Sequence, residues 1–224
     1  MKRLLAVLMA ALSVASFAGC GKNEGEATEP YLDVPTELVI NDVDENSEEA
    51  KAVKAAAAQM LDTFITGDID AIKAFLIDED ENWFAFDSEE QNALYREIFP
   101  KISYEFSFVS EHEGVYGVMT TITSPNMAEV YGRIITDIMD LAQSGQPYTL
   151  EELRKRNTET MQNILRNEED IVKREQDLYI YVEHTGSEYT PRCDIFLANE
   201  LVGGAMEASG ELSAAMNEIM ALEE

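Results

Sequence analysis

The fold is indicated by one stretch of alternating apolar and polar residues, Ile102-Ser103-Tyr104-Glu105-Phe106-Ser107-Phe108. A period of two is typical of a half-buried β-strand, because successive side chains of a strand point to opposite faces of the sheet. Gly114 then marks a turn, and residues 115–122 are rich in strand-forming residues. The stretch therefore predicts a β-hairpin in the middle of the chain.

A second hairpin is predicted closer to the C-terminus. Leu178, Ile180 and Val182 alternate with tyrosines, Gly186 supplies a turn, and residues 189–197 have the composition of a returning strand. Two hairpins can join as a four-stranded antiparallel sheet.

Segments with a helical period lie on both sides of each hairpin. The first helix is expected to begin near Asn46 or Ser47 and to end at Gly67, because asparagine and serine are good N-caps and glycine ends helices. Asp68 can cap a short second helix, and Thr149 with Glu152 forms a capping box for a later one. Further helices are expected over residues 88–99, after Pro125, and from about Asn199 to the end. The whole pattern predicts an α+β fold with about six helices packed on the sheet.

The N-terminus has the composition of a secretory signal. Lys2 and Arg3 are followed by residues 4–18, which carry no charge. A helix of that length spans about 22 Å, short of the roughly 30 Å hydrocarbon core of a bilayer. A cleaved signal is therefore favoured over a membrane-spanning helix.

The end of this segment resembles the lipobox of bacterial lipoproteins. Ala18, Gly19 and Cys20 match that motif, whereas Phe17 stands where leucine is usual. The resemblance implies a diacylglycerol on the Cys20 thiol and cleavage between Gly19 and Cys20. It also implies a lipid anchor on the extracytoplasmic face of the cell membrane. The alternative is an ordinary signal whose cleavage site happens to neighbour a cysteine.

The chain accordingly divides into a signal peptide (1–19), a lipidated N-terminus with an acidic spacer (20–45) and a single α+β domain (46–224). Its formal charge is −28, which excludes nucleic acid as an expected partner, because phosphates would be repelled. The membrane contact must then come from the acyl chains. If Cys20 is acylated, Cys193 has no partner for a disulfide, and it is expected to be a small buried apolar residue.

The body of the chain resembles a group of uncharacterised lipoproteins from Firmicutes, related to the nuclear-transport-factor-like or cystatin-like cone fold. The clearest motif is the segment Phe196-Leu197-Ala198-Asn199-Glu200-Leu201-Val202-Gly203-Gly204. The chain departs from that group at residues 189–191, where Tyr-Thr-Pro replaces a usual Trp–Lys pairing. The group has no known activity to transfer.

One acidic loop has the spacing of a calcium ligand set. Asp78, Asp80, Asn82 and Glu89 fall at positions 1, 3, 5 and 12 of the window, as in an EF-hand loop. Trp83 occupies the sixth position, where glycine normally makes the turn. The alternatives are a calcium site and a solvated acidic loop. The aromatic cluster at residues 83–86 inside this loop is expected to fold back as a plug over the sheet, and the alternative is an exposed recognition patch.

The only histidines, His112 and His184, lie near predicted hairpin ends, where they could meet or simply face solvent. No catalytic residues are predicted. The sequence thus favours a non-catalytic binding or interaction module of the cell envelope, with an unknown protein or small-molecule partner. The alternatives are a small-ligand carrier or enzyme that uses a cone-fold pocket, and a calcium-dependent interaction module. No cofactor is expected apart from the covalent lipid and, in that last alternative, calcium.

The lipobox generates a direct prediction. A Cys20→Ser precursor should incorporate no labelled palmitate in a bacterial host, because serine lacks the thiol that accepts the diacylglycerol. Acyl labelling at the level of the unsubstituted chain would contradict it.

Overall fold

The structure, a computed structural model, describes residues 41–73, 75–76, 84, 86, 89–144, 149–167 and 171–208. Its helices are α2 (Glu48–Thr66), α3 (Ile69–Lys73), α4 (Glu89–Ile98), the 3₁₀ helix η2 (Phe99–Lys101), α5 (Met127–Ser144), α6 (Leu150–Arg166) and α7 (Ile195–Leu201). Its strands are β1 (Asn41–Asp42), β2 (Ser103–His112), β3 (Val115–Pro125), β4 (Lys173–Thr185) and β5 (Glu188–Pro191).

The strands form one antiparallel sheet in the order β1-β2-β3-β4-β5. The predicted α+β class and the two hairpins, β2–β3 and β4–β5, are confirmed. The sheet has five strands rather than four, because Asn41 and Asp42 pair with Glu111 and Ser110. A two-residue strand has no period that a sequence could reveal. These residues were expected in the spacer before residue 46, but in the structure they belong to the sheet.

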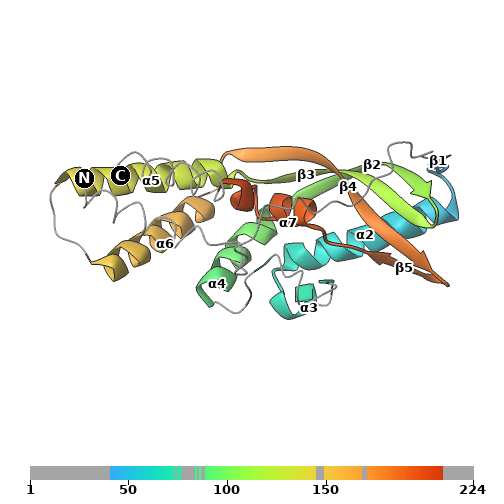
Figure 1. The fold of residues 1–224 in the computed structure, drawn as a ribbon, viewed down its shortest axis with the longest axis horizontal. Helices are drawn as coiled ribbons and strands as arrows, with labels where there is room; N and C mark the ends of the chain where they lie inside the picture. Colours follow the sequence, from blue (N-terminus) through green and yellow to red (C-terminus); the bar gives the residue numbers. More distant parts are fainter. Residues whose placement is uncertain are drawn as a thin grey trace, which may run out of the picture.

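Helices cover only one face of this sheet, which we call the inner face (Figure 1). The inner face carries Tyr116, Val118, Ile180 and Val182, all of which are buried. Helix α2 runs beneath the strands and contacts β2, β3, β4 and β5. Helices α5 and α6 lie side by side at the end of the molecule opposite β1 and β5. The other face, which we call the outer face, carries no described helix.

The predicted caps position α2 as expected. The Ser47 hydroxyl accepts a hydrogen bond from the Ala50 N–H, and Gly67 ends the helix in the left-handed conformation at φ 68°. Asp68 caps α3 through Oδ1, which accepts from the N–H groups of residues 70 and 71. The capping box of Thr149 with Glu152 is also present at the start of α6.

The aromatic plug is confirmed for the part of it that the structure describes. Phe84 and Phe86 are buried, and their rings stack with centroids 5.2 Å apart. Phe84 also packs against Phe64 of α2 at 5.6 Å and against Tyr95 of α4 at 5.7 Å. The plug therefore fills the space between helices α2 and α4 instead of covering the sheet directly.

The strand predicted over residues 189–197 is wrong beyond Pro191. Strand β5 ends at that proline, and Asp194 begins helix α7 by accepting a hydrogen bond from the Leu197 N–H at 2.8 Å. Aspartate is a strong N-cap, so Asp194 starts a helix three residues after the proline. The apolar run after Asp194 is consequently the first turn of a helix, which buries Leu197 and Ala198 and leaves Phe196 exposed. The final helix thus begins before residue 199, and it is interrupted at residues 202–204.

The strict alternation of the first strand is also interrupted. The register of β2 against β3 shifts between Phe106 and Val109, which is a β-bulge. Tyr104 and Phe106 face inward, whereas Phe108 turns to the outer face and is 39% exposed. The bulge thus exposes the aromatic side chain of Phe108, which an uninterrupted period of two would have buried.

Gly203 docks the segment after α7 against the start of α5. Gly203 has φ 65°, and its carbonyl accepts a hydrogen bond from the Met127 N–H at 2.9 Å. A Cβ at Gly203 would lie 1.8 Å from the Pro125 carbonyl oxygen. The close approach of these two backbone segments therefore requires glycine.

We predict that Gly203→Ala lowers the free energy of unfolding by about 3 kcal/mol or more, because positive φ and the clash with a backbone oxygen both disfavour a side chain. Gly132→Ala is the matched control. Gly132 lies on an exposed side of α5 with nothing within 4 Å of a Cβ, so alanine should stabilise the chain by about 0.5–1 kcal/mol. Equal effects of the two substitutions on urea unfolding would contradict this account.

Candidate functional site

The candidate site is an open groove between strand β4 and helix α7, which we call the β4 groove. Its volume is about 790 Å³. It is lined by Arg174, Gln176, Asp177, Leu178, Tyr179, Tyr181, Asp194, Ile195, Phe196, Asn199, Glu200, Met206 and Glu207. Figure 1 shows α7 lying along β4 where β5 no longer pairs with it.

Strand β4 is longer than its partner, and this leaves part of its edge unpaired. Strand β5 pairs only with residues 182–185 of β4, and the Arg192 N–H then donates to the Tyr181 carbonyl at 2.8 Å. Beyond that bond the chain turns into α7. The structure gives no backbone hydrogen bond on this side of β4 between Lys173 and Tyr179 in the part of the chain it describes.

The direction of the backbone groups follows from the bonds at the ends of the ladder. The His184 N–H donates to the Gly114 carbonyl at 3.1 Å, and the Val172 carbonyl accepts from the Asn126 N–H at 2.8 Å. Even-numbered residues of β4 thus direct their backbone groups toward β3. Because the period is two, the N–H and C=O groups of residues 173, 175, 177 and 179 face the open edge.

Helix α7 is held beside this edge by an ion pair. The Arg174 guanidinium donates two hydrogen bonds to the Glu200 carboxylate, at 2.8 and 2.9 Å, and a third contact reaches Glu207 at 3.0 Å. Glu200 is only 6% exposed. The Asn199 side chain donates to the same carboxylate at 3.1 Å and accepts from the Glu207 N–H. The carboxylate therefore has partners on both oxygens, as a buried charge requires.

Exposed apolar surface continues from the groove onto the outer face of the sheet. Phe196 of α7 is 66% exposed and Tyr181 of β4 is 36% exposed. The Tyr179 ring reaches across β3 to Phe108, with centroids 6.1 Å apart. It can do so because Gly117 lies beneath it: a Cβ there would be 3.0 Å from the Tyr179 ring.

Asp194 lines the groove where the chain passes from β5 into α7, and Cys193 precedes it in the chain. Burial raises the pKa of the Asp194 carboxyl, although backbone N–H groups of α7 donate to it. Cys193 is buried, as predicted, and burial raises the pKa of its thiol well above the usual range. A buried thiol of this kind is unreactive, because the thiolate is the nucleophile.

The candidate calcium ligands lie mostly outside the described residues: Asp78, Asp80 and Asn82 do so, and only Glu89 can be placed. Glu89 is exposed at the start of α4, and its carboxylate accepts from the Arg96 guanidinium at 2.9 Å. Within the described ranges, no group of three or more His, Cys, Asp or Glu side chains is arranged to hold a metal ion. The calcium site stays a prediction.

The two histidines lie at the same end of the sheet but on opposite faces. His112 pairs with Val115 of β3, which pairs with Glu183 of β4, so these residues share the outer face. His184 follows Glu183 and faces inward, where it stacks on Tyr189 with centroids 4.4 Å apart. A site that uses both histidines is therefore excluded.

A pocket between sheet and helices would have needed tyrosines that point into a cavity. Tyr179 and Tyr181 instead line the open β4 groove. The Tyr104 hydroxyl donates to Asp62 of α2 at 2.8 Å, and burial with this carboxylate raises the pKa of Tyr104 to about 12. Tyr104 thus fastens the sheet to α2.

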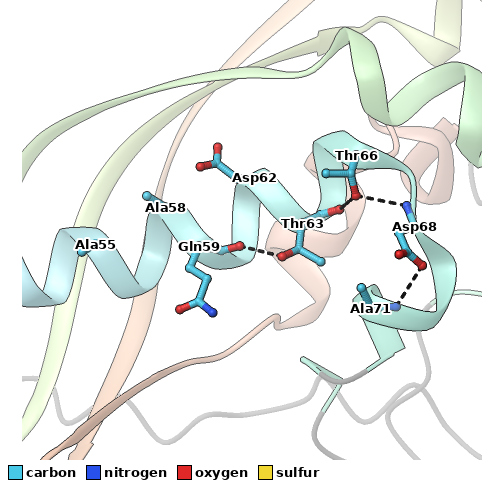
Figure 2. A pocket seen from close by; sticks show the side chains of 8 residues that line it. All are labelled: Ala55, Ala58, Gln59, Asp62, Thr63, Thr66, Asp68 and Ala71. Carbon is cyan, nitrogen blue, oxygen red and sulfur yellow. Dashed lines mark hydrogen bonds between the residues drawn. The ribbon is translucent and has the colours of Figure 1, made fainter.

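A second hollow lies on the exposed side of α2 and has a volume of about 610 Å³ (Figure 2). Its hydroxyls are already occupied: Thr63 donates to the Gln59 carbonyl at 2.8 Å, and Thr66 donates to the Thr63 carbonyl at 2.7 Å. Asp68 is occupied by capping α3. Asp62, which also lines the hollow, accepts from the Tyr104 hydroxyl of β2, so most polar groups of the hollow are already engaged.

Sequence reasoning missed the β4 groove, since its wall is the segment that was expected to be a strand. The signal that could have located it is Pro191 followed by Asp194, a strand end and a helix cap three residues apart. The predicted anchor residues, Gly19 and Cys20, lie outside the described residues. Within those residues, no helix is long and apolar enough to span a membrane.

Comparisons of the chain with protein-family models, with curated proteins and with solved structures find no match.

We predict that Arg174→Met lowers the free energy of unfolding by about 3 kcal/mol, because it leaves the buried Glu200 carboxylate without its arginine. The matched control is Arg192→Met, which removes an exposed partner of Glu183 and should cost at most about 1 kcal/mol. Adding Glu200→Leu to Arg174→Met should restore stability, since both charges are then absent. Equal losses for Arg174→Met and Arg192→Met would show that the ion pair does not hold α7.

Proposed function

We propose that this chain is a lipid-anchored module of the cell envelope that binds an extended polypeptide segment along the free edge of β4. The anchor is the acylated Cys20, and the spacer that follows holds the domain away from the bilayer. The domain itself performs no chemistry on its partner. Its role is to capture a polypeptide close to the outer face of the membrane.

The anchor is supported by the N-terminal sequence. A positive start, an uncharged run and the sequence Ala18-Gly19-Cys20 follow one another in the order of a lipoprotein signal. Two or three acyl chains are enough to hold a domain on a membrane. An acidic chain such as this one therefore needs no basic patch for membrane attachment.

The observation that carries the binding function is the unpaired segment of β4 between Lys173 and Tyr179. Exposed N–H and C=O groups in a row are a template for another strand, and an extended peptide that adds to an edge gains a ladder of main-chain hydrogen bonds. Most edge strands are short or covered. Here, within the part of the chain that the structure describes, residues 173–179 have no strand paired on this side, and a groove beside them leaves room for the side chains of a second strand.

The alternative of a small-ligand carrier is less well supported. A small-molecule site usually encloses most of its ligand within a cavity. The β4 groove is instead open along its length and is bordered by a strand edge, which matches an extended chain better than a compact ligand.

The test uses a displayed library of random twelve-residue peptides, selected on the full chain in detergent micelles. Enriched peptides should bind Glu175→Pro about tenfold more weakly than Glu175→Ala in fluorescence anisotropy, because only proline removes the outward N–H. Both variants lack the same carboxylate, so their difference reports the backbone alone. A tenfold change in affinity corresponds to about 1.4 kcal/mol of binding free energy.

Thermal unfolding of both variants checks that the sheet is intact. Failure to enrich any peptide, or equal binding by Glu175→Pro and Glu175→Ala, would contradict the proposed function.

A further inference from the structure

Resting on the proposed function, we infer that the segment bound along β4 alternates basic and apolar residues, with its lysines or arginines on the outer face of the sheet. The inference concerns the chemistry of the partner. It follows from the charges and the exposed apolar side chains on the two sides of the β4 edge.

The outer side of the open edge carries acidic residues. Odd-numbered residues of β4 face outward, so this face of the open segment carries Lys173, Glu175, Asp177 and Tyr179; Glu175 and Asp177 lie next to each other, and both are exposed. The Asp177 carboxylate accepts from the Thr121 hydroxyl at 2.6 Å, which fixes its position on the sheet surface. A residue directly opposite on an added strand would lie about 5 Å away, within reach of a cross-strand ion pair.

The charges that line the groove also favour a basic partner. Among its lining residues one arginine stands against four carboxylates, those of Asp177, Asp194, Glu200 and Glu207. Arg174 is moreover already engaged by Glu200 and Glu207. The groove therefore attracts cations, and the net charge of the chain, −28, adds a long-range attraction for a basic partner.

The inner side of the same edge has a different character. Here the wall is α7 and the residues after it: Glu200 and Glu207 are paired with Arg174, and the apolar groups presented beside them are Ile195, the exposed ring of Phe196 and Met206. Alternate side chains of an added strand would rest against this apolar wall, while the others would face Glu175 and Asp177. One strand thus meets acids on one face and apolar groups on the other, which selects an alternating basic and apolar sequence.

The test uses three fluorescein-labelled twelve-residue peptides in which valine alternates with lysine, with threonine or with glutamate. Binding to the full chain in detergent micelles is followed by fluorescence anisotropy at low and high salt. The valine–lysine peptide should bind at least tenfold more tightly than the valine–threonine peptide at low salt, and the difference should shrink at high salt. The valine–glutamate peptide should bind most weakly.

A double variant, Glu175→Gln with Asp177→Asn, removes the two acids and keeps both backbone N–H groups. It should weaken binding of the valine–lysine peptide about three- to tenfold and leave the valine–threonine peptide unchanged. Asp140→Asn, an exposed acid on α5, is the matched control and should change neither.

The outcomes separate the two proposals. If the valine–threonine peptide binds as tightly as the valine–lysine peptide, and Glu175→Pro weakens both, the basic preference is overturned while edge binding stands. If the double variant weakens the valine–lysine peptide no more than Asp140→Asn does, the acids of β4 are not its contact and the inference is overturned. If none of the three peptides binds, both proposals fail.

Discussion

The ion pair between Arg174 and Glu200 is the interaction on which the candidate site depends. It joins the start of β4 to the end of α7, and it buries one carboxylate almost completely. A buried pair of this kind adds little net stability, but loss of one partner is costly. Its effect here is geometric: α7 stays beside β4 without covering the strand edge. Gly203 reinforces this arrangement by bringing the end of α7 into backbone contact with the start of α5.

The two faces of the sheet differ in what covers them. Helices α2 and α7 contact the strands from the inner face, α5 and α6 lie together at one end of the molecule, and the aromatic plug of Phe84 and Phe86 completes the core between α2 and α4. No described helix covers the outer face, and there the bulge in β2 and the small Gly117 let Phe108 and Tyr179 meet. The exposed aromatic surface, the open edge of β4 and the wall of α7 are therefore neighbouring parts of one surface.

Much of the fold could be predicted because its signals are local. Ser47, Gly67 and the pair Thr149–Glu152 act as caps in the structure as the sequence indicates, since a cap depends on a few adjacent residues. The errors arose where distant contacts decide. The segment after Pro191 has the composition of a strand, yet α7 forms because its apolar side fits the space beside β4. The site could not be predicted, because whether the edge of β4 is open depends on how far the neighbouring strand β5 extends along it.

The most direct test of the account is amide hydrogen exchange along β4 of the free chain, measured by nuclear magnetic resonance. Backbone groups of residues 175, 177 and 179 face the open edge, whereas those of residues 176, 178 and 180 bond to β3. The account predicts fast exchange at the odd-numbered amides and slow exchange at the even-numbered ones, because only a paired N–H is protected in a stable sheet. Uniform protection from 174 to 180 would mean that the edge is already covered, and that would contradict the central claim.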